Sequence, residues 1–295
     1  MESTYSPPFE FLVDGLLAKG NLAMLAGPHN SGKSLLALQM LRAIDEGKRF
    51  LGRKTQQARV LYLSLEDSEA QVRQRVKNFQ WRPSSRARMG FFLPELDGQG
   101  LGRIATLAPF YDLIVVDPLF AAVSSNVDGN SNAQMTPIMR QLRAIASDTP
   151  TAIVLVHHTQ SSRNHEDIFR NIWGAEALRR ECDVVILLEK GVAEKSAVLH
   201  MEINAPTFRK IGIRQTDDGA FVPSAIGGGA GRRVVEALRA TGDGATSQQL
   251  ADSISITVSS ARLQLKNAER DGLVRRETSK AGSKFKPVDV WFVVT

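Results

Sequence analysis

Short apolar runs recur along the first 190 residues, and each is nearly continuous in Val, Ile, Leu and Ala. They occupy residues 21–26, 60–63, 113–116, 152–156 and 184–188. A run without polar alternation is typical of a strand buried on both faces, as in a parallel sheet that helices cover on each side. The pattern therefore predicts at least five such strands.

Helical periodicity fills the intervals between these runs. Apolar side chains at helical spacing predict helices over residues 35–44, 68–79, 135–146 and 175–181. Strands that alternate with helices favour a doubly wound α/β domain with a mostly parallel sheet. Two later extended runs, 197–203 and 209–215, are expected to add antiparallel strands at the sheet edge.

The pattern changes after the glycine-rich segment 227–231, which we interpret as a linker between domain 1–226 and domain 232–295. Beyond it, helices are predicted over residues 232–240, from Ser247 as a serine cap, and over 257–270. Extended runs 273–276 and 288–292 flank a basic turn, 280–286. Three helices followed by a β-hairpin predict a winged helix-turn-helix domain.

The composition is that of an ordinary globular protein, with 43% hydrophobic and 23% charged residues among 295. No apolar run reaches the ~18 residues of a membrane span, and residues 1–11 have neither a basic leader nor an apolar signal core. The single cysteine, Cys182, excludes an internal disulfide and a cysteine-based zinc site. We therefore expect a cytoplasmic protein without membrane contact.

The net charge of +6 is concentrated near the C-terminus. Residues 230–295 contain 11 Lys/Arg and 7 Asp/Glu, whereas the first 229 residues contain 26 and 24. A basic domain favours a polyanionic partner such as nucleic acid.

A GxxxxGK[ST] motif lies between the first buried strand and the first predicted helix, which is the context that a phosphate loop requires. Its residues are Gly27, Pro28, His29, Asn30, Ser31, Gly32, Lys33 and Ser34, and Leu35 continues into the helix. Backbone N–H groups and the helix N-terminus would surround the phosphates of a nucleoside triphosphate. Lys33 would reach the β- and γ-phosphates, and Ser34 would bind Mg²⁺. The predicted cofactors are ATP and Mg²⁺.

Two acids follow other predicted strands. Asp117 ends the run 113–116 and is the expected second Mg²⁺ residue. Glu66, just past the second strand, is the candidate base that orients and deprotonates water, and we expect that strand end to lie beside the phosphate loop. Asp67 is the alternative base, unless it caps the helix that begins at Ser68.

His157 and His158 end the fourth strand, where one histidine could sense the γ-phosphate and signal to the next loop. Neighbouring strand residues point to opposite faces, so only one can do this. The alternative is a hydrogen-bonded histidine in a turn. Together with His165 they lack the further acids or cysteines that a zinc site would need.

The order of these motifs resembles RecA-like ring ATPases, and most closely the RepA-type hexameric helicases of plasmids. The resemblance covers roughly residues 8–225 and rests on the phosphate loop, Tyr-Leu-Ser-Leu-Glu-Asp, Leu-Ile-Val-Val-Asp-Pro, Val-His-His-Thr and the leading segment 11–17. It implies a homo-hexameric ring with active sites between subunits, Glu66 as catalytic base and His158 as phosphate sensor.

Such rings complete each site with a basic finger from the neighbouring subunit. The family usually carries Lys-x-Asn or Lys-x-Arg there, but this chain has Glu202-Ile203-Asn204. Arg209 and Lys210 are the first choice for the finger, and Arg179 and Arg180 are the second.

Two loops would face the pore of such a ring. Residues 121–132 contain no Lys or Arg and are equally consistent with a surface loop, whereas residues 160–173 carry Arg163, His165 and Arg170. The second loop is the expected grip on DNA phosphates.

In the C-terminal domain, helix 257–270 would be the recognition helix, with Ser260, Arg262 and Lys266 as candidate DNA contacts. The predicted wing contributes Lys284, flanked by Arg275, Arg276, Lys280 and Lys286.

Three functions are consistent with these features. The leading hypothesis is an ATP-driven helicase or translocase on DNA that serves replication of a plasmid, phage or mobile element. The others are a non-translocating, DNA-binding regulatory or recombinase-like ATPase, and a helicase loader whose winged helix binds protein. A simple kinase is disfavoured because no arginine-rich lid segment is found.

Overall fold

The computed structural model describes residues 10–160, 167–191, 194–203, 207–224, 229–242, 244–270, 274–279 and 288–293. Contacts divide the chain into two compact units. The larger comprises Met1–Lys190, Leu199–Lys210 and Gln215–Pro223, and the smaller comprises Gly191–Val198, Ile211–Arg214 and Ser224–Thr295. Among the described residues, no helix is both long and apolar enough to cross a membrane.

A nine-stranded sheet forms the centre of the main fold, with the order β11-β10-β9-β8-β3-β7-β6-β4-β5. Its strands are β3 (Leu22–Gly27), β4 (Val60–Ser64), β5 (Ala87–Gly90), β6 (Leu113–Asp117), β7 (Ala152–His158), β8 (Val184–Lys190), β9 (Ser196–Ile203), β10 (Thr207–Gln215) and β11 (Phe221–Ser224). The six strands from β8 to β5 in this order are parallel. A separate hairpin pairs β1 (Phe11–Val13) with β2 (Leu17–Ala18).

Strands β8 to β11 follow one another both in the sequence and in the sheet. Their connections are at most five residues long. A parallel connection needs a dozen or more residues, so these neighbours are antiparallel. The predicted antiparallel strands at residues 197–203 and 209–215 therefore lie at the sheet edge, and β11 extends the edge by one more strand.

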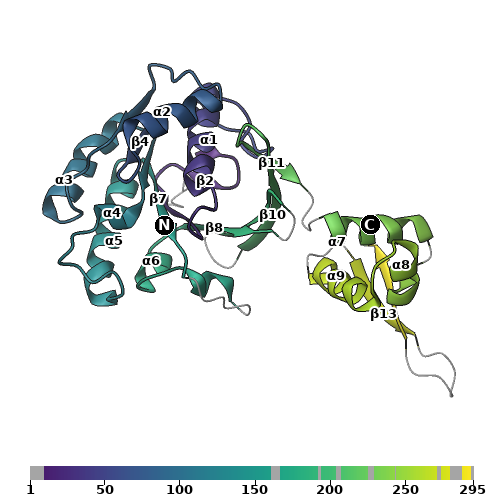
Figure 1. Cartoon of the computed structure of the whole chain (residues 1–295). Coiled ribbons are helices and arrows are strands. Elements are labelled where there is room, and N and C mark those ends of the chain that lie inside the picture. The colour runs from purple at the N-terminus through teal and green to yellow at the C-terminus, as the bar shows by residue number, and fades with distance from the viewer. Residues whose placement is uncertain are drawn as a thin grey trace, which may run out of the picture. The chain divides into compact units, whose positions relative to one another are not determined.

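Helices cover both faces of the sheet. They are α1 (Lys33–Glu46), α2 (Glu69–Asn78), α3 (Gly98–Leu107), α4 (Leu119–Ala122), α5 (Asn132–Asp148) and α6 (Ala177–Arg180), with short 3₁₀ turns η1 (Ala108–Phe110) and η2 (Ile168–Asn171). Buried side chains of α3, α4, α5 and α6 join those of β3, β4, β6, β7 and β8 in one core cluster. Helix α1 packs against β3, β4 and β7, and Figure 1 shows it on the side of the sheet opposite α3 and α5. The α/β prediction is confirmed.

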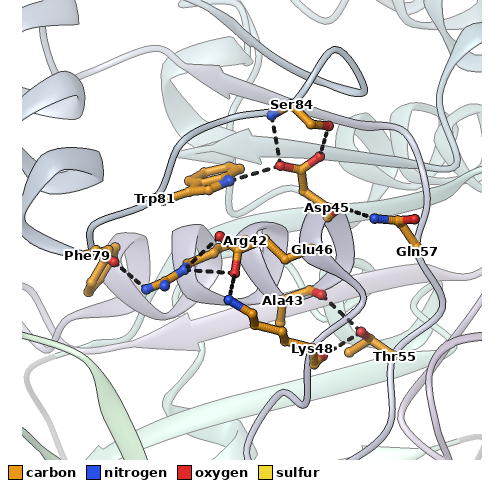
Figure 2. A network of polar contacts seen from close by, with 10 residues as sticks. All are labelled: Arg42, Ala43, Asp45, Glu46, Lys48, Thr55, Gln57, Phe79, Trp81 and Ser84. Carbon is orange, nitrogen blue, oxygen red and sulfur yellow. Dashed lines mark hydrogen bonds and ion pairs between the residues drawn. The ribbon is translucent and has the colours of Figure 1, made fainter.

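A buried carboxylate ties the end of α1 to the segment that follows α2 (Figure 2). Asp45 is 1% exposed and accepts hydrogen bonds from Trp81 Nε1 (3.0 Å) and from Ser84 N (3.0 Å), and it also contacts Ser84 Oγ. Gln57 Nε2 donates to the Asp45 carbonyl at 3.0 Å. Because a buried carboxylate is stable only with donors around it, this network fixes the chain between α2 and β5 onto α1.

The C-terminal part contains three helices and a three-stranded antiparallel sheet of order β12-β14-β13. The helices are α7 (Gly229–Thr241), α8 (Ser247–Ser253) and α9 (Val258–Arg270), and the strands are β12 (Ala245–Thr246), β13 (Val274–Ser279) and β14 (Val288–Val293). Their common core includes Val234, Leu238, Leu250, Leu265 and Trp291.

Some details differ from the sequence prediction. Helix α7 begins at Gly229, so the last three residues of the predicted linker 227–231 are helical, and the first two lie outside the described residues. Thr246, not Ser247, caps α8, through a capping box with Gln249. The predicted basic turn 280–286 lies outside the described residues.

Replacement of Asp45 by alanine should remove the hydrogen-bond acceptor of three donors, of which Trp81 Nε1 is buried and the two Ser84 groups are partly buried. We expect Asp45→Ala to lower the free energy of unfolding by about 3 kcal/mol, measured by urea denaturation with far-UV circular dichroism. The control is Asp148→Ala, an exposed acid at the end of α5, which should change it by less than about 0.5 kcal/mol. Equal stability of the two variants would contradict a structural role for the Asp45 network.

Candidate nucleotide site

The GxxxxGK[ST] segment is a tight loop between β3 and α1. Gly27 is the last residue of β3, and Gly32 caps α1 in a left-handed conformation with φ of 93°. A Cβ on Gly32 would lie 2.7 Å from the Phe221 ring of β11, and one on Gly27 would lie 2.8 Å from the Leu188 carbonyl oxygen. Both glycines are therefore required by the close approach of neighbouring strands.

The loop encloses a lysine and a serine that have few polar partners. Lys33 is 5% exposed, and its Nζ donates to the Pro28 carbonyl at 2.8 Å. Burial lowers the pKa of Lys33 to about 8, although Asp117 and Glu66 oppose this shift. The Ser31 Oγ is buried and has no hydrogen-bond partner among the described residues. Such a cradle has unused donors for an anion.

Asp117 lies at the end of β6, is 6% exposed and accepts a hydrogen bond from the Tyr62 hydroxyl at 2.6 Å. Burial raises the pKa of Asp117, while hydrogen bonds from Tyr62 and Ser34 act to lower it. The contact with Ser34 brings together the hydroxyl and the carboxylate that the sequence predicts as Mg²⁺ ligands. Sequence analysis does not predict Tyr62, on β4, as a site residue, although it is the one aromatic residue in an otherwise aliphatic run.

Glu66 and Asp67 follow β4 but have different surroundings. The guanidinium of Arg75 binds Asp67 through both of its carboxylate oxygens. Ser68, not Asp67, caps α2, in a capping box with Gln71. Glu66 is exposed and acts electrostatically on Lys33 and His158. Asp67 is thus held in a structural ion pair, and Glu66 is the acid that faces the loop.

Strand β4 is not the neighbour of β3 in the sheet, because β7 and β6 lie between them. Glu66 nevertheless reaches the loop region because the Leu65 N–H donates to the Asp117 carbonyl at 2.8 Å. This bond and the Tyr62–Asp117 bond hold the segment after β4 against the end of β6.

The two histidines at the end of β7 face opposite sides, as predicted. His158 pairs with Gly27 in the parallel register, and its ring lies 5.6 Å from that of His29 in the loop. Burial and the charge of Lys33 lower the pKa of His158. His158 is therefore the histidine on the phosphate-loop side.

His157 is fully buried on the other side of β7, and its Nε2 donates to the Trp173 carbonyl at 2.7 Å. Its ring lies 4.7 Å from Phe120, which in turn lies 4.6 Å from Trp173. Burial lowers the pKa of His157 to about 4, so the ring is neutral at pH 7. One histidine thus connects the end of β7 with the loops that follow β6 and β7.

The first candidate pore loop, residues 121–132, also contacts the segment that directly follows the second one, residues 160–173. The Ala175 N–H donates to the Gly129 carbonyl at 2.8 Å, and the Ala177 N–H donates to Asn132 Oδ1 at 2.8 Å. In the second loop, Arg170 is exposed on η2 and lies 3.8 Å from Asp167, while Arg163 lies outside the described residues.

The structure separates the two sets of candidate finger residues. Arg179 donates to Glu202 (2.9 Å) and to Asp167 (3.1 Å), and its guanidinium covers the Phe169 ring. Arg180 is exposed. Arg209 and Lys210 are exposed on β10.

The candidate DNA contacts of the C-terminal part lie mainly on α9. Arg262 and Lys266 are exposed there, and the half-buried Ser260 accepts a hydrogen bond from Gln264. Arg275 contacts Glu277, and Arg276 lies near Glu269 and Asp289. Lys284 lies outside the described residues.

The comparison with protein families identifies the larger part of the fold. A family model described as an AAA domain matches residues 3–164, more than half of the chain. This range contains the phosphate loop, Glu66, Asp117 and both histidines of β7.

Three solved structures share the fold. A RadB recombinase is 20% identical with a TM-score of 0.50, and the match covers 71% of this chain and 93% of that chain. A KaiC-like protein from the hyperthermophilic archaeon Pyrococcus horikoshii OT3 is 14% identical with a TM-score of 0.51, over 72% of this chain and 94% of that chain. A DnaB-like replicative helicase is 10% identical with a TM-score of 0.56, over 73% of this chain and 61% of that chain. At these identities the likeness shows a shared α/β fold.

Removal of the His157 ring should release the link between the two loops. Trp173 is 43% exposed and is held by the hydrogen bond from His157 to its carbonyl. Because His157→Ala removes this bond, we expect Trp173 to become more exposed, its emission to shift to longer wavelength and its quenching by acrylamide to increase. The Trp173→Phe variant, alone and combined with His157→Ala, isolates this signal from Trp81 and Trp291. An unchanged Trp173 spectrum in His157→Ala would show that His157 does not hold this loop.

Proposed function

Because the chain belongs to the AAA domain family, whose members are P-loop ATPases, we propose that it is an ATP-hydrolysing ring motor that acts on DNA as a replicative helicase or translocase. The observation that carries the ATPase part is the convergence of Lys33, Glu66, Asp117 and His158 around one glycine loop. Each residue comes from a different strand end or its following segment, as in ligand sites of parallel α/β sheets.

Residues 27–35 would hold the triphosphate. The phosphates would be surrounded by the backbone of the loop residues Gly27, Pro28, His29, Asn30, Ser31 and Gly32. Lys33, Ser34 and Leu35 would contribute from the start of α1. The buried Lys33 ammonium and the unpartnered Ser31 hydroxyl support this assignment, because a phosphate supplies an acceptor for Ser31 and further acceptors for Lys33 beside the Pro28 carbonyl.

Ser34 and Asp117 fit a magnesium ion, since a hydroxyl and a carboxylate already in contact are hard oxygen ligands. Mg²⁺ would neutralise negative charge on the β- and γ-phosphates. No group of three or more metal-binding side chains occurs among the described residues, which agrees with an ion held largely by phosphates and water.

Glu66 would act as the general base. It is the exposed acid facing the loop, whereas Asp67 is held by Arg75. Its carboxylate would orient a water molecule and accept its proton as the water attacks the γ-phosphate. His158, on which the charges of both Lys33 and Glu66 act, would report whether that phosphate is present.

A ring assembly would supply the missing cation. Charge develops on the transferred phosphoryl group, and cations aimed at it lower the barrier. Arg179 is neutralised by two acids, so Arg209 and Lys210 remain the proposed finger, contributed to the site of a neighbouring subunit. The shared core with a DnaB-like helicase is consistent with such a ring, which we propose to be a hexamer.

The C-terminal part would be a winged helix that contacts DNA. Helices α8 and α9 precede the β13–β14 hairpin, which is the order of helix, recognition helix and wing. Arg262 and Lys266 are exposed on α9, while Arg275 and Arg276 have acidic partners. We therefore assign the DNA contacts of this part to α9, and those of the pore to the loop with Arg163 and Arg170.

A protein-binding role for α9 is the second candidate, because Leu263 is 62% exposed between Arg262 and Gln264. Such a side chain fits the apolar pocket of a protein partner, as in a helicase loader. Displacement of a labelled strand by the wild-type protein would favour the motor. Duplex binding at one sequence without displacement would favour a regulatory ATPase, and no response to nucleic acid would favour the loader.

Two variants should separate nucleotide binding from turnover. Lys33→Ala should weaken ATP binding at least tenfold, because it removes a buried cation that faces the phosphates. Glu66→Gln should bind ATP as the wild type does and hydrolyse it at least about 100-fold more slowly. Fluorescent-nucleotide titration and phosphate release measure the two steps. Normal hydrolysis by Glu66→Gln would show that the base is another residue.

A further inference from the structure

The C-terminal part contains a pocket of about 700 Å³ that the proposed function does not use. It is lined by the end of α7, the turn between α7 and β12, the start of β13 and the end of β14. The lining residues are Leu238, Arg239, Gly242, Gly244, Arg275, Phe292 and Val293. Among the described residues none from α9 lines it, so the pocket is separate from the DNA contacts proposed on that helix. Its volume is typical of sites for small ligands, which span ~300–1,000 Å³.

One wall of the pocket is an aromatic ring with an arginine over it. Phe292 on β14 and Arg275 on β13 are cross-strand partners, and the Arg275 guanidinium lies 4.9 Å from the centroid of the Phe292 ring. Arg275 also contacts Glu277 on its own strand, and both side chains of that pair are more than half exposed. The charge of Arg275 is thus offset. Its guanidinium and the ring together form a platform on which a further planar group can stack.

A glycine allows the Phe292 ring to occupy this wall. Gly244 precedes β12, whose Ala245 pairs with Trp291, and the same register places Gly244 opposite Phe292. A methyl group on Gly244 would lie 2.5 Å from Cε1 of the ring, and Gly244 has φ of 83°. Any other residue here would be strained and would have to displace the ring.

The turn between α7 and β12 leaves room for a ligand. Gly242, also a lining residue, has φ of 68°. A methyl group on Gly242 would meet no other part of the fold within 4 Å, as far as the structure describes it. The pocket is therefore open beside the end of α7.

Arg239 supplies the charge at this opening. It is exposed in the last turn of α7, and none of the ion pairs found in the described ranges includes it. Arg276 differs, because it lies near Glu269 and Asp289. The part of the pocket lining that the structure describes contains no acid. Arg239 is thus available to an anion, and its planar guanidinium fork suits a phosphate group.

A cation beside a stacking platform matches the two parts of a nucleotide. The phosphate would bind Arg239, and the base would stack on the platform of Arg275 and Phe292. An acidic peptide would use Arg239 but would leave the platform without a planar partner. A base inside a duplex is already stacked on its neighbours, so only an unpaired base can enter.

We propose that this pocket binds one unpaired nucleotide of a single-stranded nucleic acid, with its phosphate at Arg239 and its base on Arg275 and Phe292. The inference rests on the proposed action on DNA and goes beyond it. It assigns a single-strand contact to a pocket outside both α9 and the loop 160–173. Unwinding of a duplex would supply such a strand.

The test is photocrosslinking of the full chain to a single-stranded oligonucleotide that contains 5-iododeoxyuridine, a base that couples to aromatic side chains in contact with it. Mass spectrometry of the peptides locates the adduct. We expect an adduct at Phe292 in the wild type. Arg239→Ala should lower its yield at least about fivefold, because the phosphate loses its cation. Phe292→Leu should abolish this adduct.

Controls separate a specific contact from a loss of charge or of structure. Arg103→Ala removes an exposed arginine on α3 and should give the wild-type yield at Phe292. Arg239→Lys keeps the charge and should retain more of the yield than Arg239→Ala. Unlabelled single strand should compete better than a duplex of the same sequence. Phe292→Leu is checked by far-UV circular dichroism, and the exposed Arg239 tests the site even if that variant unfolds.

The outcomes distinguish this inference from the proposed function. If the wild type binds no nucleic acid and forms no adduct, the proposed action on DNA fails together with the pocket. If adducts form only on other segments, or if Arg239→Ala keeps the full yield at Phe292, the pocket assignment alone is overturned. If Phe292 forms no adduct and a fluorescent poly-glutamate peptide binds the wild type but not Arg239→Ala, the pocket is a docking site for an acidic protein segment and the nucleotide assignment is overturned.

Discussion

The site depends on a buried lysine ammonium that must be compensated by acids from other strands. Lys33 is almost fully enclosed, and Asp117 and Glu66 are the charges that favour its protonated form. Asp117 is itself buried and needs the Tyr62 hydroxyl and the Ser34 hydroxyl as donors. Because each buried charge requires the next, the ends of β3, β4 and β6 are held in one arrangement.

The same arrangement connects the nucleotide region to more distant segments. On one side of β7, His158 faces the loop, and on the other side His157 holds Trp173 and packs on Phe120. A displacement of the end of β7 would therefore move the segments after β6 and β7 that contact His157. A motor would require a physical link of this kind between its nucleotide site and its loops.

Much of the fold could be predicted because buried parallel strands have continuous apolar sequences. The runs that became β3, β4, β6, β7 and β8 carry that signal, and the phosphate loop carries its own. Strand β5 has only four residues and is not fully buried, and α3 contains three glycines, which lower its helix propensity. β11 contains Pro223, which sequence rules assign to loops or edge strands.

The contacts between candidate site residues could not be predicted in the same way. Glu66 and Asp67 are adjacent in the sequence, and only the bidentate contact of Arg75 with Asp67 distinguishes them. Side-chain pairing across the fold is a tertiary property that local pattern does not encode.

The central claim is that each ATP site is completed by a neighbouring subunit. It is tested most directly by measuring hydrolysis per subunit across a dilution series, with particle mass determined in the same samples. Specific activity is expected to fall at least about tenfold as the particles dissociate, because the proposed finger residues Arg209 and Lys210 would leave the phosphates. A monomeric protein that hydrolyses ATP at the full rate would contradict it.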